Sequence, residues 1–132
     1  MNAYVLDASA WLRLFLADGP FPAGLEEAAV QVERGAAAFV APELILVEAA
    51  HALNRKCQRR FLSIKERDDL WKDLRRTPID LLPIHEHVDR ALTLCGEHRL
   101  STYDALYVAI AEHLGAPLLT ADAALAKVAA RI

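Results

Sequence analysis

Short apolar runs alternate with longer segments of helical periodicity along this chain. Runs too brief for helices, which predict buried strands, lie at residues 3–6, 37–40, 79–82 and 118–120. Segments whose apolar residues recur at helical spacing lie at 8–16, 25–33, 42–57, 63–76, 86–97 and 123–130. This alternation indicates an α/β fold with three layers, in which helices cover both faces of a short, mainly parallel sheet of four or five strands.

Capping and breaking residues predict where several helices begin and end. Pro42 suits the first turn of the helix after the second strand, and Ser63 with Glu66 forms a capping box. Gly96 and Gly115 are expected near the ends of the helices that they follow.

The segment LSTYDALYVAIAEH, residues 100–113, is expected to be the central helix. Ser101 and Asp104 have the S-x-x-D spacing of a capping box, and residues 105–111 have no polar face. Asp104 therefore lies in the first turn of a buried helix. An acid in this position can stabilise the helix dipole or take part in a chemical site, and both roles explain Asp104 equally well. Whether other acids lie beside it distinguishes the two roles.

Three further acids fall where the chain would reach the same edge of the sheet. Asp7 directly follows the first strand and Asp122 the fourth, while Asp104 opens the central helix. Glu48 lies on the long helix that leaves the second strand, one or two turns below that edge. Ligands bind outside the carboxyl ends of parallel strands, so a cluster of acids is predicted there.

Clustered carboxylates repel one another and need protons or a cation between them. Oxygen ligands without histidine or cysteine at ligand spacing favour Mg²⁺, with Mn²⁺ as a substitute. The corresponding reaction is metal-assisted phosphodiester hydrolysis. Ser9 and Thr120, each two residues from an acid, are candidates to support the site, although ordinary helix-start and strand-end roles explain them equally well.

Composition limits the class of protein. The 132 residues suit a single domain spanning 1–132, and no apolar run is long enough for a membrane span. The N-terminal segment has no basic region before its apolar run, and the two cysteines lack metal-site spacing, so a reducing cytoplasm is expected. Nucleotide-binding glycine motifs are absent from the sequence.

Charge is distributed unevenly. The net charge is −3, yet residues 55–76 contain nine basic and four acidic side chains. Arg55, Arg59 and Arg60 are candidates to contact an RNA backbone. A solvated helical face is the alternative explanation.

Four segments together resemble the signature segments of PIN-domain nucleases, most closely the VapC-type toxins of bacterial toxin–antitoxin pairs. They are VLDASA at 5–10, VEAAHALNR at 47–55, YDALYVAIA at 103–111 and LTAD at 119–122. The resemblance implies that Asp7, Glu48, Asp104 and Asp122 are catalytic, metal-binding acids. It also implies Mg²⁺-dependent endoribonuclease activity, a homodimer and neutralisation by a small antitoxin.

Two departures from the family pattern concern the end of the chain. The family usually has a further strand after the last helix, and some members have another acid where this chain has Ala123 and Ala124. These two departures leave open whether a fifth strand forms and how many metal ions bind. The alternative functions are a catalytically weak PIN-like module that binds RNA or protein, and a phosphatase or DNA nuclease that uses the same acids.

Overall fold

Four parallel strands form the sheet at the centre of the computed structural model, which describes residues 2–132. The strands lie in the order β3-β2-β1-β4. Their bounds are β1 Asn2–Leu6, β2 Ala37–Pro42, β3 Ile79–Leu82 and β4 Leu118–Leu119. The α/β fold with a parallel sheet is confirmed, and within residues 2–132 the sheet has four strands rather than five.

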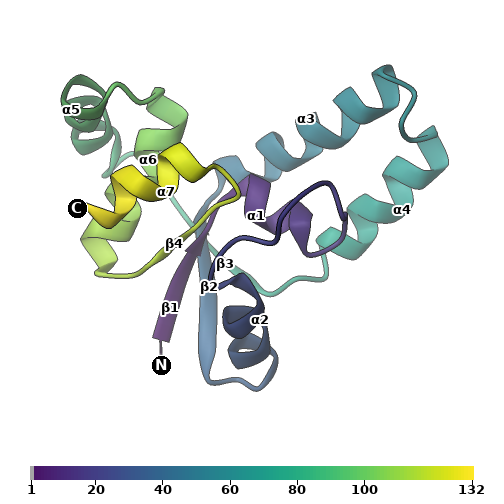
Figure 1. Cartoon of the computed structure of the whole chain (residues 1–132), viewed down its shortest axis with the longest axis horizontal. Coiled ribbons are helices and arrows are strands. Elements are labelled where there is room, and N and C mark those ends of the chain that lie inside the picture. The colour runs from purple at the N-terminus through teal and green to yellow at the C-terminus, as the bar shows by residue number, and fades with distance from the viewer. Residues whose placement is uncertain (1) are drawn as a thin grey trace.

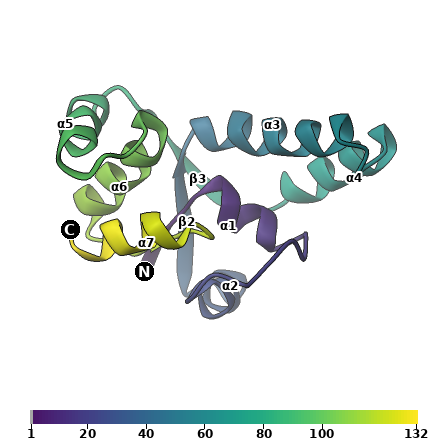
Figure 2. The same ribbon diagram turned by 45° about the horizontal axis from the view of Figure 1, so that its top comes forward.

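Seven helices surround the sheet within the described part of the chain. They are α1 Ala8–Arg13, α2 Leu25–Glu33, α3 Leu44–Gln58, α4 Ile64–Leu74, α5 Val88–His98, α6 Thr102–Leu114 and α7 Ala123–Ala130. Figures 1 and 2 show α3 and α4 side by side as an arm that extends away from the sheet, with α5 and α6 together on the opposite side. None of the helices in residues 2–132 combines the length and apolar character needed to cross a membrane.

Helix α6 is the buried element that its sequence predicts. Every residue from Ala105 to Ala111 is buried, because α5 covers one side of the helix and strands β1 and β2 the other. The Ser101 hydroxyl accepts a hydrogen bond from the N–H of Asp104, so that half of the predicted capping box is formed. Gly115 ends the helix in the left-handed conformation, with φ of 60°.

The strand order creates a crevice between β1 and β4. The chain leaves β1 for β2 and β2 for β3, then crosses back over β1 to reach β4. Neighbouring strands whose connections run in opposite directions leave an opening at their carboxyl ends, which is where ligands bind in such sheets. Asp7 and Asp122 follow these two strands.

Helix α1 is shorter than predicted. The sequence pattern favours a helix over 8–16, but α1 ends at Arg13. The N–H groups of Leu14 and Phe15 bond to the carbonyls three residues earlier, which tightens the last turn. The apolar side chains beyond Arg13 continued the helical pattern in the sequence, and Leu14 and Leu16 pack against the core from a non-helical segment.

Two predicted boundary residues have other roles. Pro42 is the last residue of β2, opposite Leu82, and the N–H of Glu43 donates to the Leu82 carbonyl, so strand pairing continues past the proline and α3 begins only at Leu44. Gly96 lies inside α5 rather than at its end. That helix ends instead at Arg99, which has a left-handed backbone with φ of 56°.

Candidate active site

One hollow of about 280 Å³ brings together the four acids that the sequence singles out. Asp7 directly follows β1, Glu48 lies on α3, Asp104 lies in the first turn of α6 and Asp122 lies between β4 and α7, which it caps. Asp7 is buried, Glu48 and Asp104 are partly buried, and Asp122 is exposed. The hollow therefore runs from the interior of the fold to its surface, with carboxylates along its length.

Asp7 and Asp122 also cap the helices that follow them. Oδ1 of Asp7 accepts from the N–H of Ala10 at 2.8 Å, and Oδ1 of Asp122 accepts from the N–H groups of Ala124 and Leu125 at 2.9 and 3.1 Å. These backbone hydrogen bonds hold each carboxylate in place at a helix N-terminus. Since they all use Oδ1, helix capping leaves Oδ2 of each acid for other partners.

Ser9 and Thr120 connect these two acids. The Ser9 hydroxyl donates to Asp7 Oδ1 at 2.7 Å, accepts from the N–H of Ala121 at 2.9 Å and lies 3.3 Å from the Thr120 hydroxyl. Thr120 in turn accepts from the N–H of Asp122 at 3.1 Å. The two hydroxyls thus join the end of β1 to the end of β4.

Glu48 is held by a residue that the sequence analysis did not select. The Tyr107 hydroxyl donates to Glu48 Oε1 at 2.5 Å, and the tyrosine side chain is only 2% exposed. Tyr107 lies three residues after Asp104, so both side chains occupy one face of α6. One feature of the sequence could have identified Tyr107: it carries the only side-chain hydroxyl in the otherwise apolar run 105–111.

Burial and mutual repulsion oppose ionisation of the acids. Burial is the main cause that raises the pKa of Asp7, Glu48 and Asp104 above their usual values. For Asp7, hydrogen bonds from Thr120, Ala10 and Ser9 offset part of that rise. Repulsion from Asp104 adds to the rise at Asp7 and Glu48, and repulsion from Asp122 adds to the rise at Asp104. The four acids therefore affect one another electrostatically.

No protein cation neutralises this group among residues 2–132. The ion pairs there involve other acids, and the residues that line the hollow include neither lysine nor arginine. In their present positions, no three acidic, histidine or cysteine side chains of the described residues are close enough to form a metal-binding group. The oxygen donors have the chemistry that Mg²⁺ requires, but they would have to close in around the ion.

The three arginines chosen from the sequence are exposed on the arm. Glu48, Ala52, Arg55 and Arg59 follow the i, i+4, i+7, i+11 spacing of one helix face, and Glu48 and Ala52 line the acid hollow. Arg55 and Arg59 thus continue the face that starts at the acids. Arg60 follows at the tip of the arm, with a left-handed backbone and φ of 63°.

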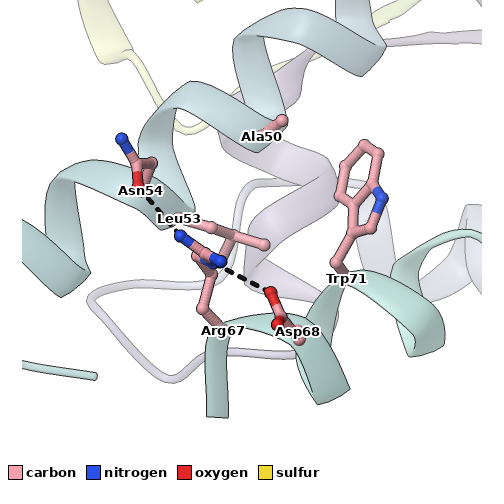
Figure 3. Close-up of a pocket in the computed structure, with 6 residues that line it drawn as sticks. All are labelled: Ala50, Leu53, Asn54, Arg67, Asp68 and Trp71. Carbon is pink, nitrogen blue, oxygen red and sulfur yellow. Dashed lines mark hydrogen bonds and ion pairs between the residues drawn. The ribbon is translucent and has the colours of Figure 1, made fainter. Parts of the chain in front are cut away.

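Most other basic residues of this segment are already engaged. Lys56, Lys65, Arg67 and Arg76 form ion pairs with nearby aspartates, and Arg75 lies over the ring of Trp71. Figure 3 shows Arg67 in a second hollow, between α3 and α4, where it reaches Asn54 and Asp68. This second hollow shares no lining residue with the acid hollow.

The sequence matches the PIN domain family over residues 4–131, nearly the whole chain. The chain belongs to the PIN-domain family. The match includes all four segments that carry the acids, together with the arm formed by α3 and α4.

The relatives of this PIN domain bear out the resemblance to VapC proteins. Ribonuclease VapC12 of Mycobacterium tuberculosis is 34% identical over 123 residues, covering 93% of this chain and 89% of its own length. Ribonuclease VapC1 of the same organism is 37% identical over 93 residues, which are 65% of this chain. The alignment spans 64% of the length of VapC1.

A solved structure supports the fold independently. The crystal structure of PAE2754 from Pyrobaculum aerophilum superimposes with a TM-score of 0.70, covering 96% of this chain and 86% of the other. Sequence identity between the two is 23%, so this likeness concerns the fold of the PIN domain.

Proposed function

We propose that this PIN domain is a metal-dependent endoribonuclease that acts as the toxin of a toxin–antitoxin pair. The observation that carries the proposal is the convergence of Asp7, Glu48, Asp104 and Asp122 on one hollow at the carboxyl edge of the sheet. The relatives named ribonuclease supply the substrate class, since phosphodiester hydrolysis alone does not distinguish RNA from DNA.

The four acids are proposed to hold Mg²⁺, with Mn²⁺ as a substitute. Carboxylate oxygens are the donors that both ions accept. Burial, with added repulsion between the acids, raises the pKa values of Asp7, Glu48 and Asp104, and a bound cation would favour their ionised forms. When bound, such an ion lowers the pKa of water and offsets charge that develops on phosphate oxygens.

The other residues of the hollow would fix the acids. Asp7 and Asp122 are held by the helix N-termini that they cap, and Ser9 and Thr120 link these two positions. Glu48 on α3 and Asp104 on α6 line the same hollow from the two helices.

Arg55, Arg59 and Arg60 are proposed to hold the RNA backbone, which the acids alone would repel. Changing all three to Ala should weaken RNA binding and reduce its dependence on salt. For about three lost phosphate contacts to a single strand, the slope of log affinity against log salt should fall by about 2. Affinity measured by fluorescence anisotropy from 50 to 200 mM salt, on a catalytically inactive background, tests this.

The matched control changes Lys65, Arg67 and Arg76 to Ala, which removes three positive charges that are already paired with aspartates. This variant should keep most of the salt dependence. Equal salt slopes for the native protein and the Arg55, Arg59 and Arg60 variant would show that these side chains are merely solvated.

Two protein partners complete the proposal. A small antitoxin is proposed to neutralise the enzyme, and a second copy of the chain to form a homodimer. The arm offers apolar surface for a partner, since Phe61 and Ile64 at its tip are 73% and 66% exposed. The hollow beside Trp71 lies on the same arm.

Incubation of the purified protein with structured and unstructured RNAs tests the enzymatic function. Cleavage is expected with Mg²⁺ and not with EDTA, and Asp7→Asn should be inactive, because its neutral side chain cannot balance a cation. Asn still presents an oxygen for the helix N-terminus, so the fold should survive. RNA that is bound but left intact by the native protein would favour a binding module, and cleavage of DNA alone would indicate a DNA nuclease.

A further inference from the structure

Within residues 2–132, Tyr107 makes the one side-chain hydrogen bond between α3 and α6, the two helices that carry the partly buried acids of the hollow. Its hydroxyl donates to Glu48 Oε1, and its ring is buried in the hydrophobic core of the fold. Asp104 lies one turn earlier on the same helix. The side chain of Tyr107 therefore connects α6, which supplies Asp104, to α3, which supplies Glu48.

Glu48 needs such a partner because its neighbours are negatively charged. Its carboxylate experiences repulsion from both Asp104 and Asp7, and the helix arm that carries it extends away from the sheet (Figure 1). Without a hydrogen-bond donor the side chain would be expected to swing toward solvent. The Tyr107 hydroxyl supplies that donor, because a phenol keeps its proton at neutral pH.

We infer that Tyr107 is a positioning residue for the acids proposed to bind metal: its hydroxyl holds Glu48 Oε1 and leaves Oε2 available for a cation. The inference rests on the proposed function, because it assumes that the hollow takes a divalent ion. Hydrogen bonds to a metal-binding side chain orient that ligand and tune its affinity, and losing one typically weakens metal binding about 10- to 100-fold.

The test compares Tyr107→Phe with Tyr4→Phe. Both variants keep the ring and remove a hydroxyl that donates to a side-chain oxygen, but Tyr4 bonds to Gln31, away from the hollow. Titration calorimetry with Mg²⁺ alone measures the dissociation constant of each protein. Tyr107→Phe should bind Mg²⁺ about 10- to 100-fold more weakly than the native protein, and Tyr4→Phe within about twofold of it.

A second variant keeps the test independent of how well Tyr107→Phe folds. Glu48→Asp retains the charge but shortens the side chain, so the carboxylate cannot reach both the hydroxyl and the ion. It should also weaken Mg²⁺ binding with Tyr107 intact. In a Glu48→Ala background, changing Tyr107 to Phe should have no further effect on Mg²⁺ affinity, because the two residues act as a pair.

The outcomes separate this inference from the function on which it rests. If the native protein takes up no Mg²⁺, both are overturned. If the native protein binds Mg²⁺ and Tyr107→Phe binds it with the same dissociation constant, only the positioning role is overturned, even when the variant melts at a lower temperature. Restored cleavage by Tyr107→Phe at raised Mg²⁺ concentration would support the role, since the chemistry of the acids is unchanged.

Discussion

Replacing Asp104 by Asn is expected to lower RNA cleavage by about three orders of magnitude and to stabilise the metal-free protein. The loss of activity follows from losing one of the acids that we propose to hold the cation, whose contribution to the transition state is expected to be several kcal/mol. The gain in stability follows from the raised pKa of Asp104, caused first by burial and then by repulsion from Asp122. An acid whose pKa is raised by folding lowers the stability of the folded state when it is ionised. Asn carries no charge and avoids this cost.

The expected gain in the free energy of unfolding is about 1 kcal/mol at neutral pH. Two charges about 5 Å apart repel by about 3 kcal/mol at an effective dielectric constant near 20, and solvent in the half-open hollow screens much of this. Chemical denaturation in EDTA measures the stability, and RNA cleavage in Mg²⁺ measures the activity.

Asp89 provides the matched control, because it is the first-turn acid of α5 and lies outside the hollow. Asp89→Asn removes a favourable interaction with the helix dipole, so it should cost about 0.3–1 kcal/mol of stability and leave cleavage unchanged. If Asp104→Asn behaved in the same way, losing stability in EDTA while remaining active, Asp104 would be a helix-stabilising acid and no part of the site.

Mg²⁺ should raise the melting temperature of the native protein at neutral pH. If the ion binds only the folded state, a concentration 100 times the dissociation constant adds about 2.7 kcal/mol, which corresponds to about 8–10 °C for a domain of this size. Asp104→Asn should show a much smaller shift. A melting temperature that is the same in Mg²⁺ and in EDTA would contradict a metal site.

The pH dependence of this shift has a definite sign. Since the pKa values of Asp7, Glu48 and Asp104 are raised, the metal-free folded state binds more protons than the unfolded state above about pH 4. These three acids therefore stabilise the metal-free folded state fully at pH values below the pKa values that they have in the unfolded chain. This stabilisation is lost as the pH rises through their higher pKa values in the folded state. Mg²⁺ requires the ionised acids, so its stabilisation grows over the same window.

Other carboxylates work in the opposite direction and must be separated from this effect. Hydrogen bonds from Lys65 and Arg90 lower the pKa of Asp69 and Glu112, so these two acids lose their stabilising contribution as pH falls. They affect the curves in Mg²⁺ and in EDTA equally. The difference in melting temperature between the two conditions, measured from pH 5 to pH 8, isolates the acids of the hollow.

Local sequence signals predicted the elements well where their ends carry turn or capping residues. The helix 25–33, the strand 79–82 and the helix 123–130 have the bounds that the sequence indicated, because Gly35, Pro78, Pro83 and Asp122 mark them. The C-terminal end of α1 could not be predicted from such turn and capping residues. Its end at Arg13 is decided by packing of the following apolar residues against the core, which a one-dimensional pattern does not contain.

The convergence of the four acids was predictable from the sequence, but the contacts that hold them were not. Asp7 and Asp122 follow strands, and parallel strands bring their carboxyl ends together, so their convergence follows from the topology. The role of Tyr107 depends on the relative rotation of α3 and α6, which brings together two side chains distant in sequence. That Asp7 and Asp122, rather than Asp104, are the helix-capping acids also depends on backbone geometry.

The pairing of β1 with β4 ties the assembly of the acid hollow to the course of protein synthesis. Asp7 is synthesised well before the strand that completes its side of the hollow, and before Asp122, which follows that strand. A chain whose translation stops before Leu118 can fold its earlier helices but lacks the edge of the sheet where the acids meet. Prematurely terminated products should therefore lack the RNA cleavage proposed for this domain, which is expected to appear only after the β4 segment has been synthesised.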